Sequence, residues 1–504
     1  MSPWRPRSAV DLVGAINLVA TLTKYLSLAT LVPAAVAIGY SEPPWPFLLG
    51  GVIVGGVSLG IEFLTRGDHR IGAREGFLVV SLTWLAAAAL GALPYLLSSE
   101  VQLDRPVDAY FEAMSGFTTT GASVLTDIEG VSHSILLWRQ FTQWLGGIGI
   151  IVLALAVLPR LRVGGRQLLE HEMPGPEIES LSTRIRDTAR RVWILYVALT
   201  ALLIVCLTTF ALTGIDDRMT VFDAVAHALT TMPTGGFGTD ATSLEEFSAA
   251  THWTIALFML LAGANFALLY RAFVRREPKA FARDEEFRLY AALLAVGSLV
   301  IGVQIWLEGI QTGEAAVRHA VFQTVSTMTT TGFATIDFAV WPTLAAMTLV
   351  GLMFIGGSAG STSGSVKVVR HLLMGRILRR EIDQTLHPEI VAPVRLNRGV
   401  VDERTLRSIS GFIVLYIGIF VLGASLLAAD AARTGIELSV LDAIAASATT
   451  LGNVGPGFGF AGPFGTFEPF SDFSTIVMTG LMWLGRLEVI PIVVLFSRHY
   501  WRNA

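Results

Sequence analysis

Residues 114–123 read MSGFTTTGAS and residues 328–335 read MTTTGFAT, so a run of threonines that ends in glycine interrupts the apolar chain twice. The two runs belong to a larger pattern, because related segments occur at FDAVAHALTTMPTG (222–235) and LDAIAASATTLGNVG (441–455). Each copy opens with Asp-Ala or His-Ala, and a glycine follows 13, 12, 13 and 13 residues later, from Asp108 to Gly121, Asp223 to Gly235, His319 to Gly332 and Asp442 to Gly455. The spacing predicts four copies of one structural unit.

The composition of the chain places these copies in a lipid bilayer. The 504 residues are 53% hydrophobic and 15% charged, with a mean hydropathy of +0.60, which is more apolar than a soluble domain. A spanning helix needs about 20 apolar residues. Ten candidate stretches lie at residues 17–40, 45–65, 76–98, 134–158, 190–213, 252–273, 288–308, 341–378 with an interruption, 405–429 and 473–497. We expect an all-α, multi-pass membrane protein with ten transmembrane helices, whose first stretch is a retained anchor because no cleavage signature follows it.

The basic residues are distributed unevenly between the loops. Of the 36 Lys and Arg, 29 lie near the termini or in the segments 66–74, 160–191, 271–288 and 367–407, and the alternate segments hold Arg105, Arg218, Arg318 and Arg433. By the positive-inside rule, the basic segments and both termini are expected to be cytoplasmic. The opposite loops carry many acids, which either keep exposed loops soluble or form an acidic vestibule that concentrates cations.

Each unit is expected to contain a spanning helix, an outer segment, a short helix, a Thr/Gly segment and a second spanning helix. An Asp at the start of three short helices suits the positive end of the helix dipole, and the negative end then faces the Thr/Gly segment. All four units enter and leave on one side, so they are parallel repeats around an axis and not inverted repeats. The expected domains are two N-terminal helices (1–70) and four pore repeats (71–165, 166–280, 281–390 and 391–504).

The Thr/Gly segments predict a cation site. Irregular backbone persists at membrane depth where it is buried in protein or lines water, and four such segments around an axis present carbonyl oxygens that replace the hydration shell of K⁺. One TTTG alone would indicate a turn, whereas four copies favour a pseudo-symmetric selectivity filter, in which Pro233 and the GNVGPGFG of 452–459 break the threonine pattern. The expected filter residues are Thr119, Thr120, Gly121, Thr234, Gly235, Thr330, Thr331, Gly332, Asn453, Val454 and Gly455.

A run of small residues, GGSAGSTSGS (356–365), interrupts the eighth apolar stretch. Three interpretations are open: a linker between helices, a GxSxG serine nucleophile at Ser358, and an obstruction in the ion path. No strand precedes the serine and no intramembrane His offers a base, so the enzymatic interpretation is the weakest. The expected gate residues are Gly356, Gly357, Ser358, Gly360, Ser361, Gly364, Lys367 and Arg486.

Charged residues inside apolar stretches are costly, and they usually face a cavity or a partner charge. Arg486 is interpreted either as a positive charge in the ion path, which slows cations or holds the gating loop, or as half of an ion pair with another helix. Lys367 lies beside the ion path or marks the cytoplasmic interface. Arg139, near the outer end of its stretch, is interpreted as an interfacial or structural residue.

Motifs for other chemistry are missing from the sequence. The glycine-rich stretches at 146–150 and 235–238 lack a strand-turn-helix setting, and GxxxxGK does not occur. The nine His show no metal-ligand spacing, and the single Cys206 can form no internal disulfide. The chain is therefore predicted to be no enzyme, to hold no cofactor and to bind no nucleic acid.

Five stretches resemble signatures of the Trk/Ktr/HKT superfamily of potassium transporters: FEAMSGFTTTGAS, WRQFTQWLGGIGIIVLALAVLP, HEMPGP, GGSAGSTSGSVKVVR and GRLEVIP. The resemblance implies that Gly121, Gly235, Gly332 and Gly455 are filter glycines, that the small residues form an intramembrane gating loop, and that Arg486 lies in the pore. It also implies a homodimer in the lipid of the cytoplasmic (inner) membrane, docked on a cytosolic nucleotide-binding regulatory subunit of the TrkA type.

Residues and resemblance together predict potassium uptake through a carbonyl-lined filter, with K⁺ as the transported ion and a gating loop beneath it. The alternative is a proton- or sodium-coupled potassium symporter of the same architecture. That alternative requires a titratable or ion-binding group that changes its exposure, and the sequence offers no convincing carboxylate at mid-membrane depth.

Overall fold

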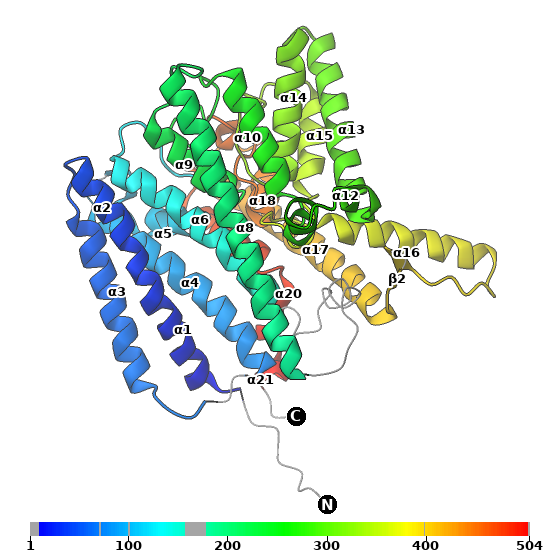
Figure 1. Cartoon of the computed structure of the whole chain (residues 1–504), viewed down its shortest axis with the longest axis horizontal. Helices are drawn as coiled ribbons and strands as arrows, with labels where there is room; N and C mark the ends of the chain where they lie inside the picture. The colour runs from blue at the N-terminus through cyan, green and yellow to red at the C-terminus, as the bar shows by residue number, and fades with distance from the viewer. Residues whose placement is uncertain (1–9, 70–71, 99–100, 157–177, 398, 502–504) are drawn as a thin grey trace, which may run out of the picture.

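The computed structural model describes residues 10–69, 72–98, 101–156, 178–397 and 399–501, and these residues are mainly helical (Figure 1). The HEMPGP motif (171–176) and part of the basic segment 160–191 lie outside the described residues. Two short strands, β1 (Arg395–Leu396) and β2 (Gly399–Val400), pair antiparallel. The expected helical class is therefore confirmed.

Two N-terminal spans precede four successive sets of helices. The N-terminal elements are α1 (Leu12–Leu26), the 3₁₀ turn η1 (Ser27–Thr30), α2 (Leu31–Gly39) and α3 (Trp45–Leu64). The first set contains α4 (Ala73–Leu97), the 3₁₀ turn η2 (Val101–Leu103), α5 (Pro106–Phe117) and α6 (His133–Ala156). The second contains α8 (Ile178–Thr213), α9 (Val221–Thr231), α10 (Ala249–Ala262), α11 (Phe266–Leu269) and the π-helical turn η3 (Tyr270–Val274).

In the third and fourth sets, as in the first two, one long helix comes before the short helix and is the longest of its set. The third contains α12 (Lys279–Arg283), α13 (Glu285–Leu307), α14 (Gly313–Met328), α15 (Thr343–Met353) and α16 (Val368–Leu386). The fourth, after the β-hairpin, contains α17 (Glu403–Thr434), α18 (Val440–Gly452), the 3₁₀ turn η4 (Gly459–Ala461), α19 (Asp472–Arg486), α20 (Ile490–Leu495) and α21 (Arg498–Trp501).

Fewer continuous spans are found than the ten that the sequence predicted. Within the described ranges, six helices are long and apolar enough to cross a membrane, and a seventh candidate is a pair of helices bent by 105° at residues 263–265. The stretch 341–378 is divided by a non-helical segment, residues 354–367, which we call the small-residue loop. The last stretch, 473–497, is divided between α19 and α20. Three expected spans are therefore broken helices, and one of these breaks was predicted.

Local residue chemistry explains the two unexpected breaks. Asn265 starts α11 by accepting hydrogen bonds at its Oδ1 from Ala267 N at 2.8 Å and Leu268 N at 3.3 Å. This cap begins a new helix in a new direction. Between α19 and α20, Glu488 and Val489 have φ values of 56° and 58°, in the left-handed region that ends a right-handed helix. The first break contains only the small residues Gly263 and Ala264 and the second contains none, so neither resembles the ten-residue run that marks the loop in the sequence.

The four short helices α5, α9, α14 and α18 start in different ways. In α9 and α18 the expected Asp completes a capping box with Thr220 and Ser439, respectively. The expected start of α14 at His319 is wrong, because this helix begins at Gly313 and carries His319 in its interior. Glu314 supplies the negative charge in its first turn, where the helix dipole is positive.

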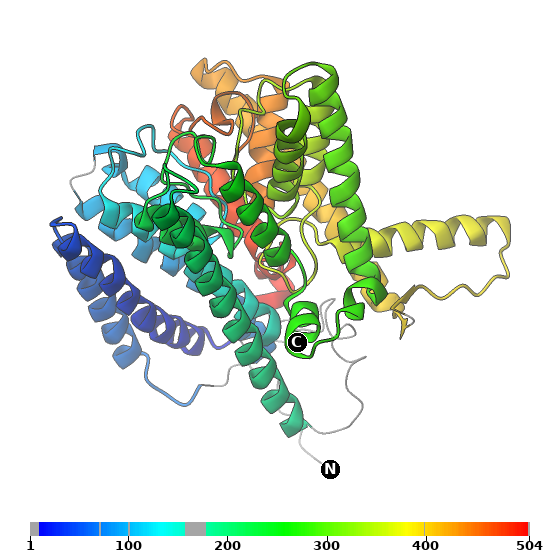
Figure 2. The ribbon, with the colours of Figure 1, turned by 45° about the horizontal axis from the view of Figure 1, so that its top comes forward.

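The arrangement in space separates the N-terminal helices from α16. Helices α1 and α3 pack on α4 at one side, while α16 projects from the opposite side (Figure 1), and the projection is also seen in the turned view of Figure 2. Asp11 N donates to Glu75 Oε1 at 3.1 Å, and Tyr500 O–H donates to Arg74 O at 2.8 Å. The start of α1, the start of α4 and α21 therefore share one end of the molecule.

Candidate functional site

Four glycine-bearing segments, one directly after each short helix, share a backbone conformation. In each, a residue in the left-handed region is followed two positions later by a glycine with positive φ. The left-handed residues are Thr119 (φ 53°), Thr234 (57°), Thr330 (58°) and Asn453 (54°), and the glycines are Gly121 (84°), Gly236 (79°), Gly332 (85°) and Gly455 (113°). The N–H between them donates to the carbonyl five residues earlier, from Thr120 to Ser115, Gly235 to Thr230, Thr331 to Ser326 and Val454 to Thr449, at 2.8 to 2.9 Å.

This shared geometry corrects the expected register of the second segment. Gly236, and not Gly235, has the positive φ, and it lies 13 residues after Asp223, so the spacing is 13 in all four copies. Gly235 occupies the position that is equivalent to Thr120 in the first segment. Two adjacent glycines made the second copy look one residue shorter, because spacing alone does not tell which glycine needs the positive φ.

The four segments adjoin one another in cyclic order. A Cβ added to any of the four positive-φ glycines would lie less than 3.0 Å from a carbonyl oxygen of another segment. The carbonyls concerned are Gly235 O for Gly121, Thr331 O for Gly236, Val454 O for Gly332 and Thr120 O for Gly455. Each segment touches the next and the fourth touches the first, and we call this arrangement the ring. A side chain at these glycines would strain the backbone and displace a carbonyl.

The polar side chains of the ring are buried and none is charged, whereas Gly121, Gly236 and Gly332 are partly exposed. The expected polar filter residues are at most 1% exposed, namely Thr119, Thr120, Thr234, Thr330, Thr331 and Asn453. The negative ends of four helix dipoles gather at the ring, because each short helix ends there. In the described part of the chain, no group of three His, Cys, Asp or Glu side chains could hold a metal ion. The oxygens therefore suit a monovalent cation better than a divalent metal, which prefers carboxylates.

The small-residue loop lies against three of the four ring segments. Gly364 N donates to Thr330 Oγ1 at 2.7 Å, and Thr362 Oγ1 donates to Met232 O, just before the second segment, at 3.1 Å. A Cβ added to Gly364 would collide with Gly452 O, at the start of the fourth segment. Glycine at position 364 thus lets the loop approach the ring backbone directly.

The other expected gate residues hold the loop together and attach it to the break between α10 and α11. Their contacts are Gly356 N to Val366 O at 2.9 Å, Ser358 N to Gly263 O at 2.8 Å, Ser361 Oγ to Ser358 O at 2.6 Å, Phe266 N to Gly360 O at 3.2 Å, Lys367 Nζ to Ser363 O, and Gly357 packed on Gly263. Ser358 Oγ is buried, and it has no hydrogen-bond partner among the described residues that could activate it as a nucleophile.

Arg486 joins the small-residue loop to α6. Its Nη1 donates to Thr362 O at 2.9 Å, and its Nη2 donates to Gly146 O at 3.2 Å. Within the described ranges Arg486 makes no ion pair, and the neighbouring Glu488 pairs with Arg370 instead. The ion-pair interpretation of Arg486 thus finds no partner, whereas the contact with the loop is direct.

A polar face of α6, which the sequence alone did not single out, lies behind the first two segments. Gln143 Nε2 donates to Gly235 O at 2.7 Å, and Gln143 Oε1 accepts from Phe237 N at 3.2 Å. One turn earlier, Arg139 forms a buried ion pair with Glu112. The available signal was WRQFTQW, where the arginine and the second glutamine are four residues apart in an apolar helix and so share a face.

Several acids of the opposite loops are engaged with neighbouring donors. The carboxylate of Asp216 accepts from Ser248 N at 2.8 Å and from Thr251 Oγ1 at 2.6 Å. Although burial alone would raise it, the pKa of Asp216 lies below its usual value, because these donors favour the ionised carboxylate. Asp240 pairs with Arg218 at 2.5 Å. These contacts favour a structural interpretation of the acids over a free acidic vestibule.

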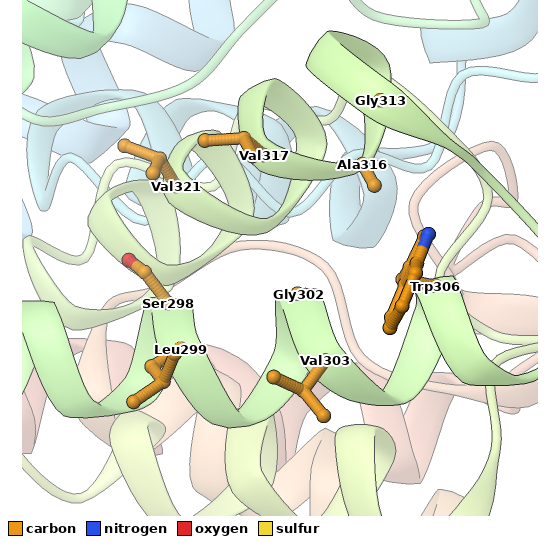
Figure 3. A pocket seen from close by; sticks show the side chains of 9 residues that line it. All are labelled: Ser298, Leu299, Gly302, Val303, Trp306, Gly313, Ala316, Val317 and Val321. Carbon is orange, nitrogen blue, oxygen red and sulfur yellow. The ribbon is translucent and has the colours of Figure 1, made fainter.

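A groove of about 490 Å³ lies between α13 and α14 (Figure 3). Its lining is apolar apart from Ser298 and the exposed edge of Trp306, and Leu299, Trp306 and Val317 are more than half exposed. An apolar groove that is open at the surface offers few oxygens to replace the hydration shell of an ion. The ring, and not this groove, is therefore the candidate site.

A bundle of apolar helices around a buried ring of carbonyls defines a membrane transport protein. Residues 47–502 match the TrkH family, described as a cation transport protein, and this chain belongs to that family. The chain is 38% identical to the Trk system potassium uptake protein TrkH of Escherichia coli (strain K12) over 86% of each chain. It is 34% identical to TrkG of the same organism over 95% of this chain and 96% of that protein.

A solved structure agrees with this assignment. The crystal structure of the potassium transporter TrkH from Vibrio parahaemolyticus matches with a TM-score of 0.86 and 34% identity, covering 98% of this chain and 100% of that one. The likeness thus extends over nearly the whole chain. The chain is accordingly a transporter and not an enzyme.

Proposed function

We propose that this protein takes up potassium ions across the cytoplasmic membrane and that the ring is its selectivity filter. The observation that carries the proposal is the cyclic contact between four positive-φ glycines and four carbonyls in a site without charged side chains. Carbonyl oxygens at a fixed spacing replace the hydration shell of a monovalent cation. The names of the relatives, which are potassium uptake proteins, support K⁺ as the cargo.

The small-residue loop is the gate below this filter, and Arg486 holds it in place. Support comes from the loop's hydrogen bonds to the ring segments and from the donation of Arg486 to Thr362 O at 2.9 Å. Opening the path requires the loop to withdraw from the ring and this hydrogen bond to break. Because the loop is attached at Gly263 as well, a movement of the helices beside the loop reaches the filter directly.

The proposal includes an assembly, which the same family membership supports. The protein forms a homodimer with one ion path per chain, and its cytoplasmic face docks on a nucleotide-binding regulatory subunit of the TrkA type. The relatives carry the name Trk system, which supports an assembly of several components. Both termini face the cytoplasm, supported by the shared position of α1 and α21. The four sets of helices correspond to the four expected pore repeats, and no resident cofactor is required.

Rubidium and sodium fluxes into liposomes that contain the purified protein test the proposed function. We expect rubidium flux to follow its gradient and the applied voltage, and to exceed sodium flux. A strict requirement for a proton or sodium gradient would favour coupled symport, for which the ring offers no titratable group. If protein-containing and protein-free liposomes took up rubidium equally, with folded protein present, the proposal would be refuted.

A further inference from the structure

A fully buried ion pair lies directly behind the first ring segment. Arg139 of α6 and Glu112 of α5 have side chains that are 1% and 0% exposed, and Arg139 Nε lies 2.8 Å from Glu112 Oε1. Removing two charges from water is costly, and a buried pair often stabilises a fold no better than apolar residues of the same size. Stability alone therefore does not account for the pair.

Both partners bind the residues that follow Gly121. Ser123 Oγ donates to Glu112 Oε1 at 2.9 Å and accepts from Arg139 Nη2 at 3.1 Å. Val124 N donates to Glu112 Oε2 at 3.1 Å. The ion pair thus fixes the first segment two and three residues after its glycine, where the chain leaves the ring.

The same face of α6 binds the second segment. The Arg139 guanidinium lies 4.2 Å from the centroid of the Phe237 phenyl group. Gln143 donates to Gly235 O at 2.7 Å and accepts from Phe237 N at 3.2 Å. Gly235 O is the carbonyl that abuts Gly121 where the two segments touch. We call each of the four contacts between neighbouring segments a seam. Glu112, Arg139 and Gln143, which we call the bracket, therefore contact both the first and the second segments.

The other seams of the ring are held by different groups. The position of Glu112, nine residues before the positive-φ glycine, is occupied by His227, Gln323 and Ala446 in the other copies. Neither ring nitrogen of His227 has a hydrogen-bond partner among the described residues. Gln323 Nε2 donates to Thr335 Oγ1 at 3.4 Å, and alanine donates and accepts no side-chain hydrogen bond. A charged group at this position is thus present in one copy of four.

We propose that the bracket is a specificity-determining element, which keeps the ring at the spacing of dehydrated K⁺ and opposes its contraction around Na⁺. This inference rests on the proposed function of the ring as a filter. A carbonyl that is hydrogen-bonded from behind moves less, and hydrogen bonds in a buried, low-dielectric site are strong because water does not compete for them. The bracket residues touch no ion, so they act as positioning residues.

Two single variants separate positioning from folding. Gln143→Met keeps the length of the side chain and removes both bonds to the second segment without unpairing a charge. Ser123→Ala removes the two hydrogen bonds between Ser123 and the ion pair and leaves the pair itself intact. We expect both proteins to fold, and their rubidium-to-sodium flux ratio in liposomes to fall by roughly three- to tenfold, which lies within the range by which residues without ligand contact modulate coupling.

A double variant tests the ion pair itself. Glu112→Leu combined with Arg139→Met replaces both charges with apolar side chains, so that neither partner is left buried and unpaired. We expect folded protein, with a melting temperature close to that of the wild type, and a reduced flux ratio. If the ion pair only occupies space in the protein interior, the flux ratio of the folded double variant will be unchanged.

Asp430→Asn is the matched control for loss of a buried carboxylate. Asp430 is 3% exposed, pairs with Arg433 at 2.6 Å and accepts from Ser474 Oγ at 2.6 Å, at the junction of α17 and α19. We expect this variant to lower the melting temperature and to leave the flux ratio unchanged. An equal loss of selectivity in the control would overturn the inference, because general destabilisation would then explain every result.

Gly332→Ala separates failure of the inference from failure of the proposed function. If Gly332→Ala lowers the flux ratio while the folded bracket variants keep it, the inference is overturned and the filter assignment survives. If Gly332→Ala and the bracket variants all keep the wild-type ratio, the filter assignment and the inference fail together. If Gln143→Met does not fold, the result for Ser123→Ala decides, since that change leaves the bracket in place.

Discussion

The first and fourth segments of the ring share a backbone shape and are held by different chemistry. The values of φ at the left-handed residue and the glycine are 53° and 84° at Thr119 and Gly121, and 54° and 113° at Asn453 and Gly455. The first segment is fixed from behind by the buried pair of Glu112 and Arg139. The fourth has Ala446 at the position of the glutamate, so it needs another means of support.

A single amide supplies that support. Asn453 Nδ2 donates to Thr120 Oγ1 of the first segment and to Met482 O of α19, each at 3.0 Å. Asparagine also adopts the left-handed conformation at lower cost than most residues. The difference teaches that the ring requires a backbone shape and a glycine at each seam, whereas the side chains that enforce this shape differ from one seam to the next.

Replacing Gly121 of the first segment with serine is expected to lower the rubidium-to-sodium flux ratio more than the changes considered below. A non-glycine residue in the left-handed region costs about 1–2 kcal/mol, and the new Cβ would collide with Gly235 O. We expect Gly121→Ser to lower the rubidium-to-sodium flux ratio by about tenfold, which corresponds to about 1.4 kcal/mol. Gly435→Ser is the control, since φ is 76° there and no atom lies within 4 Å of its Cβ position. An unchanged ratio in Gly121→Ser would count against the filter.

Alanine at the two adjacent glycines tests the register of the second segment. Gly236 has a positive φ and abuts Thr331 O, whereas a Cβ at Gly235 meets the side chain of Gln143, which has room to adjust by rotation. We expect Gly236→Ala to lower the flux ratio by about fivefold, or about 1 kcal/mol, and Gly235→Ala to lower it less. A larger loss in Gly235→Ala than in Gly236→Ala would instead support the register predicted from the sequence, in which Gly235 is the filter glycine.

Loss of Arg486 is expected to change the size of the flux more than its selectivity. Arg486 connects the fourth set of helices to α6 in the first set and holds the loop at Thr362 O. Losing this hydrogen bond weakens the hold on the loop, so we expect Arg486→Ala to raise rubidium flux about threefold, which corresponds to about 0.65 kcal/mol. Arg486→Gln, which keeps a donor for Thr362 O, is expected to raise it less. Loss of folded protein in both variants, with no rise in flux, would indicate a structural role.

Removal of the amide in the fourth segment is expected to have the smallest effect. A neutral hydrogen bond contributes about 1 kcal/mol or less, so we expect Asn453→Ala to reduce the flux ratio by about twofold. Asn453→Gly keeps the left-handed conformation easy to adopt and removes the same hydrogen bonds. Equal reductions in the two variants would assign the effect to the amide, and a reduction confined to Asn453→Ala would assign it to backbone strain.

Much of the fold was predictable from local properties of the chain. Apolar stretches identify membrane helices, and the run from 356 to 365 identified a break because small residues disfavour a helix. The start of α14 and the cap at Asn265 were not predicted, since the first needs only ordinary helix-forming residues and the second depends on one side chain. The register of the second segment was ambiguous, because Gly235 and Gly236 are adjacent in sequence and differ in φ.

The sequence by itself determined a helical membrane protein with four glycine-bearing segments after short helices, because hydropathy, spacing and the conformational freedom of glycine are written residue by residue. Only the tertiary structure decided which carbonyl meets which glycine, which residues form the bracket, and that Arg486 binds the loop and has no charged partner among the described residues. The physical reason is distance along the chain: Asn453 and Thr120 are 333 residues apart, and Arg486 and Gly146 are 340 apart. Contacts between such distant residues depend on how all the helices pack, and no local pattern encodes them.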